Sequence, residues 1–344
     1  MKAIISKIFA RKKKYEDFDF SLIKSVLLRP IGAGLGDAVI LTAVLKQLKE
    51  AYPNIKTGVL AVKRNEIVFR NNPFVDKVIK DNFIGYFSNR GKWQIFIDYI
   101  PSFTTRNIIF DFILKPKYTI SFQKKEKKYY NINTIQNIDY YIPDLARTHL
   151  SKSLELTPLK PYIKTANPEY SLPEIPKECE EKAKKLLHKE KANVVLSPSG
   201  TDRKINPEEI REILKSAFEG KEDQVNLIIP FTRDSTEYIS VLRDLLPSQT
   251  PPLSTEEFFA LIKNADMIIS VDSAAVHIAC AYRKGLLAFY SGWERNFKLF
   301  APLKADNAIA IQSEISASAP VKEIKALPVE KAVASIRKLL HNKI

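Results

Sequence analysis

The segment from residue 267 to 277 carries the most informative residue pattern in the chain. An apolar stretch, Met267 to Val271, runs directly into Asp272, Ser273 and Ala274, after which a helical pattern begins. The first backbone N–H groups of a helix lack partners inside the helix and bind phosphate well. The small side chains let a ligand approach them closely, and Asp272 can accept a hydroxyl proton. The segment therefore predicts a nucleotide site. The alternative is an ordinary turn with a capping residue and a packed His277.

A second loop of low side-chain bulk lies near the N-terminus. It contains three glycines, Gly32, Gly34 and Gly36, and ends at Asp37 before a helical pattern. The spacing differs from the dinucleotide-binding fingerprint, and the next predicted strand ends in Lys63 and Arg64 without an acidic residue for a ribose. Open α/β sheets bind ligands at the carboxyl ends of their strands, so a carboxylate there suits a general base. The alternative role for Asp37 is a helix cap.

A third loop follows the apolar stretch 192–196 and has the chemistry of a diphosphate site. Ser199, Gly200 and Thr201 offer hydroxyl and backbone donors, and Lys204 offers a mobile positive charge. Pro207 then suits the first turn of a helix. A solvated lysine in a loop is the alternative interpretation of Lys204.

Composition narrows the class of protein. The 344 residues suit two domains of ordinary size, and the net charge of +15 favours anionic partners. The two cysteines are far apart and the four histidines are scattered, so we expect neither a disulfide framework nor a metal site. No apolar run reaches the ~20 residues that cross a bilayer, and no signal peptide is recognisable. These features predict a cytoplasmic protein without an essential metal.

Two basic segments suggest where the charge acts. In residues 1–20, Ile4, Ile5, Ile8 and Phe9 fall on one helical face near a run of basic residues, Arg11 to Lys14. This pattern predicts a short helix on anionic lipid, or alternatively a disordered basic tail. The segment from 115 to 130 interleaves lysines with aromatic residues, but no nucleic-acid motif accompanies it, so we expect no nucleic-acid partner.

Alternating strands and helices divide the chain into two domains of the α/β class. Strands are expected at 25–29, 56–62, 77–79, 93–99 and 118–122, and again at 192–197, 225–230, 267–271, 286–290 and 307–311. A proline-rich stretch at 166–177 separates domains 21–165 and 178–326. The last segment, 327–344, is an amphipathic helix that could pack back on the first domain. We expect two Rossmann-like domains that face one another across a cleft.

These segments, in this order, resemble the ADP-heptose:lipopolysaccharide heptosyltransferase family, glycosyltransferases of the GT-B fold. The resemblance rests on Arg29 with Gly36 and Asp37, on the segment 72–79, on the Lys204 loop, and on the segment 265–277. It implies an inverting transfer of heptose from ADP-heptose to the inner core of lipopolysaccharide, without a cofactor. The enzyme would attach peripherally to the inner face of the cytoplasmic membrane, where its acceptor lies.

The resemblance also implies roles for individual residues. Asp37 would be the catalytic base, and Lys204 would contact the donor diphosphate. The remaining donor-binding residues are expected to be Ser199, Gly200, Thr201, Asp234, Asp272, Ser273, Ala274 and His277. The acceptor-binding residues are expected to be Gly34, Gly36, Lys63 and Arg64, because an acceptor bearing carboxylates or phosphates needs cations on its side of the cleft.

Three departures from the family pattern keep other functions open. Asp272-Ser273-Ala274 stands where the family has Asp-Thr-Gly, and the glutamate that holds the ribose is missing, so that Asp234 or Glu237 would replace it. The family's Phe-Gly-Pro-Thr is replaced from Tyr290 onward. Another donor or acceptor, a nucleotide-sugar epimerase, and a basic protein that binds nucleic acid or membrane therefore remain alternatives.

Overall fold

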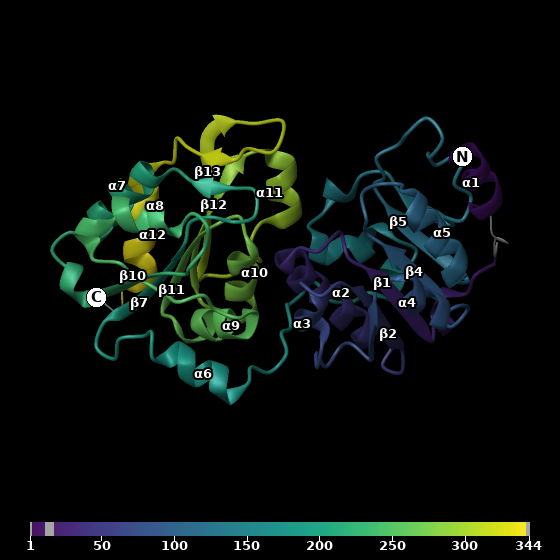
Figure 1. Ribbon diagram of the computed structural model, residues 1–344, viewed down its shortest axis with the longest axis horizontal. Coiled ribbons are helices and arrows are strands. Elements are labelled where there is room, and N and C mark those ends of the chain that lie inside the picture. Colours follow the sequence, from purple (N-terminus) through teal and green to yellow (C-terminus); the bar gives the residue numbers. More distant parts are fainter. Residues whose placement is uncertain (1, 11–16, 342–344) are drawn as a thin grey trace. The chain divides into compact units, whose positions relative to one another are not determined.

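The computed structural model describes residues 2–10 and 17–341 of the chain. The chain divides into two compact units, Met1–Pro173 and Glu174–Ile344. Each unit contains one parallel sheet of six strands with helices on both faces (Figure 1). The predicted α/β class with two Rossmann-like units is thereby confirmed. The predicted basic run Arg11 to Lys14 lies outside the described residues.

The first sheet has the strand order β3-β2-β1-β4-β5-β6, and all its pairs are parallel. Its strands are β1 (Ser25–Arg29), β2 (Lys56–Ala61), β3 (Lys77–Lys80), β4 (Ile95–Asp98), β5 (Tyr118–Phe122) and β6 (Tyr140–Ile142). The helices of this unit are α1 (Lys2–Phe9), α2 (Leu35–Ala51), α3 (Glu66–Phe69), α4 (Phe83–Ser88) and α5 (Thr105–Leu114). The central strand β1 is buried along its whole length, as parallel strands covered on both faces are.

Side chains that alternate along the strands build the core of the first unit. Leu27, Leu60 and Phe96 pack on one face of the sheet with Tyr86 of α4 and Leu114 of α5. The opposite face is covered by α2, a helix whose residues 38–45 are all buried. Burial of both faces explains why the strands read as apolar runs in the sequence.

The second sheet has the corresponding order, β10-β9-β7-β11-β12-β13, again with parallel pairs. Its strands are β7 (Ala192–Ser197), β9 (Val225–Ile229), β10 (Ser248–Gln249), β11 (Met267–Val271), β12 (Gly285–Gly292) and β13 (Ala308–Ser316). A separate parallel pair joins β8 (Lys204–Ile205) to β14 (Glu323–Ile324). The helices are α6 (Lys177–Lys184), α7 (Pro207–Phe218), α8 (Ser235–Val241), α9 (Thr255–Asn264), α10 (Ala274–Ala281), α11 (Glu294–Phe300) and α12 (Val329–Leu340).

Different helices cover the two faces of this sheet. The apolar sides of α7, α8 and α12 bury one face, and α9 and α10 lie on the other (Figure 1). The sequence suggested that the C-terminal helix packs back on the first domain, but Ala332, Ile336 and Leu340 of α12 belong to the core of the second unit. An amphipathic pattern shows that a helix has an apolar face but does not say which surface covers it.

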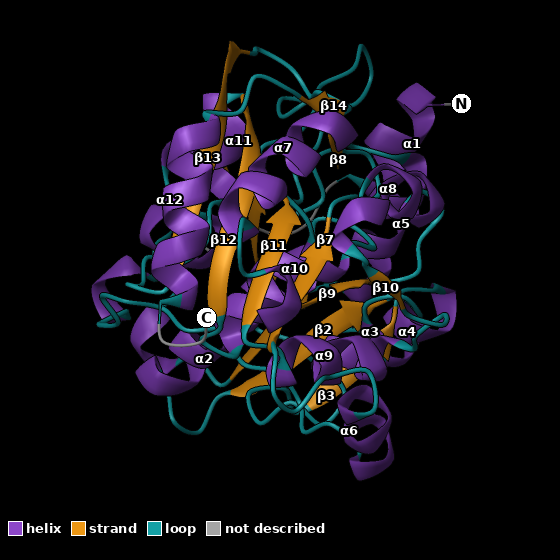
Figure 2. Cartoon of the chain, turned by 90° about the vertical axis from the view of Figure 1, so that its left-hand side faces the viewer, coloured by secondary structure: helices purple, strands orange, loops and turns teal. Residues whose placement is uncertain are grey.

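All strands of the second sheet end at the same edge because they run parallel. In Figure 2 the arrowheads of β7 and β11 point the same way, toward the end where β8 and β14 lie. The loops after these strands therefore gather at one edge of the unit, the position at which open α/β sheets bind ligands.

Candidate functional site

Asp37 lies in the first turn of α2, immediately after the glycine loop that follows β1. Gly34 caps the helix without a side chain, so Asp37 is not the capping residue. A Cβ atom on Gly34 would lie 2.6 Å from the Asp37 carboxylate oxygen Oδ2, which shows how closely that carboxylate folds over the loop. The first turn of a helix favours negative charge, so the position suits an ionised carboxylate.

A buried asparagine joins this loop to the one after β2. The side-chain amide of Asn65 donates to the carbonyl of Gly32 at 2.9 Å, and its oxygen accepts from the backbone of Val62 at 3.0 Å. Lys63 and Arg64 lie in the same turn and are exposed. The first unit thus places the predicted acceptor residues Gly34, Gly36, Lys63 and Arg64 with Asp37 at one edge of its sheet.

Behind this edge lies a buried group of four charges, which we call the Arg29 cluster (Arg29, Asp98, Asp111 and Lys124). Arg29 ends β1 and donates to both carboxylates, at 2.6 to 2.8 Å from Asp98 and 2.7 to 3.1 Å from Asp111. Lys124, after β5, donates to Asp98 and to the carbonyl of Ile100. Two cations meet two carboxylates, so the charges of the cluster compensate one another.

The two carboxylates of the Arg29 cluster differ in their surroundings. Burial alone would raise the pKa of Asp98, but Arg29 and Lys124 beside it hold that pKa below the usual range. Burial raises the pKa of Asp111 to about 6 despite its contact with Arg29. Asp98 therefore stays ionised at all ordinary pH values, whereas Asp111 is the member of the cluster that takes up a proton most readily.

In the second unit, the loop after β7 lies against the beginning of α10. Gly200 donates its N–H to the carbonyl of Arg203 at 2.7 Å and closes a tight turn. A Cβ atom on Gly200 would lie 3.3 Å from Cβ of Ser273 and 3.5 Å from the carbonyl oxygen of Asp272. This close approach brings the predicted phosphate loop, Ser199 to Thr201, to the helix start at Ser273 and Ala274.

Ser273 caps α10, and its hydroxyl accepts from the N–H of Ala275 at 3.3 Å. The same hydroxyl lies 3.0 Å from that of Ser270. His277 is buried within the helix, with 3% of its surface exposed. His277 is thus packed inside the unit, and its predicted role in donor binding stays a prediction.

Asp272 is held by two residues that the sequence analysis did not identify. Arg203 forms an ion pair with its carboxylate, and the amide of Asn296 in α11 donates to the same oxygen, Oδ2, at 2.7 Å. Arg203 also donates to the oxygen of Asn296 at 3.2 Å. Burial raises the pKa of Asp272, while Arg203 and Asn296 work in the opposite direction. These contacts keep a buried carboxylate in a defined position.

Lys204 forms an ion pair with Glu237 of α8 at 2.9 Å. The hydrogen bond to Glu237 raises the pKa of Lys204, so the side chain is cationic near neutral pH. Asp234, at the start of α8, is paired with Arg233 at 3.4 Å. Asp234 and Glu237, the suggested replacements for the glutamate that holds the ribose, thus both lie near Lys204.

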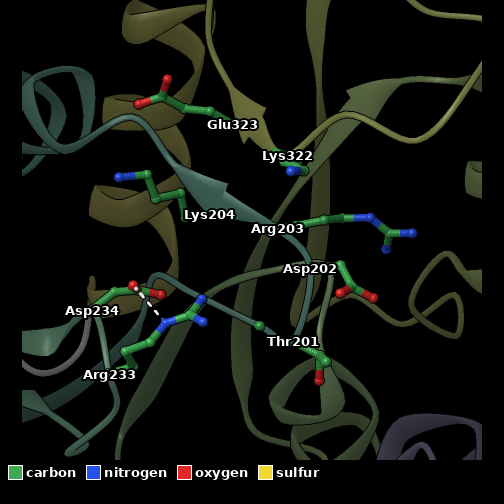
Figure 3. Close-up of a pocket in the computed structure, with 9 residues that line it drawn as sticks. Thr201, Asp202, Arg203, Lys204, Arg233, Asp234, Lys322 and Glu323 are labelled. Carbon is green, nitrogen blue, oxygen red and sulfur yellow. Dashed lines mark hydrogen bonds and ion pairs between the residues drawn. The ribbon is translucent and has the colours of Figure 1, made fainter.

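An open pocket of about 390 Å³ lies among these loops (Figure 3). Four of its lining residues are cations and three are acids: Arg203, Lys204, Arg233, Lys322, Asp202, Asp234 and Glu323. Lys204 and Glu323 lie toward one end of the pocket, and Thr201 lies toward the other (Figure 3). The excess of cations suits an anionic ligand.

The basic and aromatic segment 115–130 is not one exposed surface. Lys124 is 7% exposed and belongs to the Arg29 cluster, while Phe122 and Tyr130 are buried in the core. Within residues 2–10 and 17–341, no group of three or more acidic, histidine or cysteine side chains could hold a metal ion. In the same part of the chain, no helix is long and apolar enough to cross a membrane.

The model of glycosyltransferase family 9 (heptosyltransferase) matches residues 109–329, which is more than half of the chain. The chain belongs to glycosyltransferase family 9. The matched range contains the loop at 199–204 and the helix start at 272–274, whereas Asp37 precedes it. The protein is therefore a glycosyltransferase of the lipopolysaccharide heptosyltransferase type.

Known relatives of this family 9 protein agree with that assignment. The chain is 26% identical over 309 residues to "Putative lipopolysaccharide heptosyltransferase 4" of Escherichia coli (strain K12), covering 83% of this chain and 80% of the relative. The glycosyl transferase family 9 structure from Veillonella parvula superimposes with a TM-score of 0.69 at 14% identity, covering 93% of this chain and 97% of that one. The ADP-heptose lipopolysaccharide heptosyltransferase II of E. coli gives a TM-score of 0.62 at 13% identity, covering 93% and 99%. The expected GT-B fold is thereby confirmed.

Proposed function

We propose that this family 9 protein transfers a heptose from ADP-heptose to the inner core of lipopolysaccharide, with inversion and without a metal ion. The observation that carries the proposal is the junction of the Gly200 loop with the start of α10. There, a small-residue turn and a helix N-terminus lie beside an oriented carboxylate, Asp272. The same turn also lines a pocket whose charged residues are four cations and three acids. Such a junction binds phosphate through the backbone and leaves Asp272 for sugar hydroxyls.

In the proposed reaction, Asp37 accepts the proton of the acceptor hydroxyl. The acceptor oxygen forms its bond to the anomeric carbon from the face opposite the diphosphate, and the bond from that carbon to the phosphate oxygen breaks. The leaving group is ADP. General base catalysis of this kind contributes roughly 10²–10⁴ in rate.

Positive charge must meet the negative charge that grows on the departing diphosphate. We propose that Lys204 and the N-terminus of α10 supply it, with Ser199, Gly200 and Thr201 donating hydrogen bonds. Asp234 would contact the ribose, and Ala274 and His277 would shape the helix around the donor. Because these groups supply the charge, we expect turnover to continue in the presence of a chelator.

The acceptor is proposed to bind at the edge of the first unit that carries Gly34, Gly36, Lys63 and Arg64. Exposed cations there match the carboxylates and phosphates of a lipopolysaccharide inner core. Since that acceptor is anchored in lipid, we propose that the enzyme works at the inner face of the cytoplasmic membrane as a peripheral protein, without a nucleic-acid partner.

The test is turnover of a donor panel in the presence of EDTA, with heptose-deficient lipopolysaccharide as acceptor. The donors are ADP-heptose, ADP-glucose, UDP-glucose and UDP-N-acetylglucosamine. We expect acceptor-dependent release of ADP from ADP-heptose by the wild type, a loss of roughly 10²–10⁴ in Asp37→Asn, and full activity in the matched exposed control Asp223→Asn.

Each other outcome contradicts a particular part of the proposal. Release of UDP would overturn the heptose donor, and loss of turnover in EDTA would overturn metal independence. A changed nucleotide sugar formed without acceptor would indicate an epimerase. Absence of turnover with every donor would overturn the transferase proposal itself.

A further inference from the structure

Three large apolar side chains of α4 point outward from the first unit. Phe83, Ile84 and Phe87, which we call the α4 ridge, are 56%, 73% and 62% exposed. The phenyl rings of Phe83 and Phe87 stack with centroids 6.0 Å apart. Single exposed apolar residues are common on protein surfaces, whereas neighbouring ones that form a patch call for an explanation.

The opposite side of α4 is fixed firmly to the core. Tyr86 is fully buried and accepts a hydrogen bond from Arg29 at 3.1 Å. A Cβ atom on Gly85 would lie 2.0 Å from the carbonyl oxygen of Lys80, so the helix backbone approaches the end of β3 as closely as glycine allows. The α4 ridge is therefore displayed on a rigid support.

A second exposed apolar pair lies on α1, beyond α5. Ile5 and Phe9 hold α1 against the first unit, and the ring of Phe9 meets that of Phe112 on α5 edge to face at 5.3 Å. Ile4 and Ile8 remain 60% and 56% exposed. The sequence suggested a single lipid-facing side for all four residues. Instead, Ile5 and Phe9 pack on the first unit, and only Ile4 and Ile8 face outward.

Arg90 connects the two exposed regions. It follows α4, lies over the ring of Phe112 at 6.0 Å, and donates to the carbonyl of that residue. Both α1 and α4 pack on α5 (Figure 1), and Phe112 of α5 contacts both Phe9 of α1 and Arg90 after α4. We call the outer sides of α1 and α4, together with these linking residues, the α1–α4 surface.

The charges around the α1–α4 surface are mainly positive. The exposed cations on α1 and beside α4 in the chain are Lys2, Lys7, Lys80, Arg90 and Lys92. Within the described part of α1 and α4 there is no acidic residue, and the adjacent Asp81 is paired with Arg106 at 2.9 Å. Apolar side chains ringed by lysine and arginine fit a bilayer surface in which anionic headgroups meet the cations and acyl chains meet the apolar side chains.

We propose that the α1–α4 surface docks the enzyme on an anionic phospholipid bilayer, with the α4 ridge entering the headgroup region. This inference rests on the proposed function only in that the acceptor is lipid-linked, and it assigns the apolar part of the membrane contact to α4. A second copy of this chain is the competing occupant, but the concentration of like charge around the surface disfavours self-association.

The experiment is co-sedimentation of the full-length protein with vesicles of phosphatidylethanolamine and phosphatidylglycerol, compared with phosphatidylcholine vesicles. The test variant combines Phe83→Ser, Ile84→Ser and Phe87→Ser, three side chains that are each more than half exposed, and circular dichroism checks that the variant is folded. Leu246→Ser in the second unit is the matched control, since Leu246 is 86% exposed. We expect the triple variant to bind at least about tenfold more weakly and the control to bind as the wild type does.

A second variant tests the electrostatic part. Each lysine near an anionic surface contributes about fivefold to affinity at low salt, so Lys2→Ser with Lys7→Ser should reduce binding to the anionic vesicles about 25-fold. Added salt should shrink this difference.

Two outcomes would overturn the inference. One is unchanged vesicle binding by the triple variant. The other is a wild-type dimer in sedimentation velocity that the triple variant converts to monomer, which would assign the α4 ridge to a second copy. Transfer to detergent-solubilised acceptor is measured in parallel, because it depends on the proposed reaction and not on docking. Normal transfer with unchanged vesicle binding would thus reject the inference and leave the proposed function intact.

Discussion

Removal of the Arg29 guanidinium should destabilise the first unit in a strongly pH-dependent manner. In Arg29→Met, the carboxylates of Asp98 and Asp111 share a single cation, Lys124. Both Arg29 and Asp98 have side chains that are almost inaccessible, 2% and 4% exposed. Breaking such a buried ion pair by removing one partner costs about 3–5 kcal/mol, because a charge is left without compensation.

The pH dependence follows from Asp111. Its pKa, already raised by burial to about 6, rises further once Arg29 no longer favours the ionised form. Between about pH 6 and pH 8 the native variant then holds a proton that the unfolded chain has released. Stability therefore falls as pH rises in this window, by up to about 1.4 kcal/mol per pH unit and roughly 2–3 kcal/mol in all. In the wild type, protonation of Asp111 increases the free energy of unfolding only as the pH falls below this window.

Urea unfolding followed by tryptophan fluorescence measures the effect. The chain has two tryptophans, and the buried Trp93 belongs to the core of the first unit. In a Trp293→Phe background, the signal reports the first unit alone. Arg70→Met is the matched control, because Arg70 is exposed and paired with Glu66 one helical turn away; it should cost less than about 0.5 kcal/mol. A loss below about 1 kcal/mol at pH 8, or a loss that is the same at pH 6 and pH 8, would refute the reasoning.

Two further predictions concern the proposed site. Gly34→Ala should lower kcat roughly tenfold or more with donor affinity unchanged, since the new methyl group would displace the Asp37 carboxylate that lies 2.6 Å from its position; a normal kcat from steady-state kinetics would contradict this. Arg203→Met should raise the pKa of Asp272, which burial already raises, so turnover should be lost at low pH and recover as pH increases. A pH–rate profile parallel to that of the wild type would show that Arg203 does not support the charge of Asp272.

Strand positions followed closely from the sequence because buried parallel strands are apolar on both faces. β1, β5, β7 and β11 have the predicted bounds, and α12 lies within the segment 327–344 that was predicted as the C-terminal helix. The strands that sequence reasoning missed are β6, β8, β10 and β14. All four contain only two or three residues and β10 is also exposed, so they are set by neighbouring backbone and not by an apolar pattern.

The site was accessible to sequence reasoning only where one segment contains the whole pattern. The helix start at Asp272 and the glycine loop before Asp37 are such segments. Arg203 and Asn296 could not be found in this way, because they reach Asp272 from residues 69 and 24 positions away. For Arg29, the signal was an arginine at the end of an otherwise apolar strand, which must find buried acidic partners; its spacing says nothing of which acids these are.

The strand order also affects how the protein folds while it is being translated. In each sheet the first long strand made, β1 or β7, becomes a central strand, and one of its two neighbours arrives much later. Val26 of β1 pairs with Ile95 of β4, about 70 residues further along the chain. At translation rates of roughly 5–20 residues per second, this strand waits about 4–14 s on the ribosome with one edge unpaired and Arg29 without Asp98. The first unit therefore passes through a defined interval in which chaperones that recognise open apolar strands can bind it.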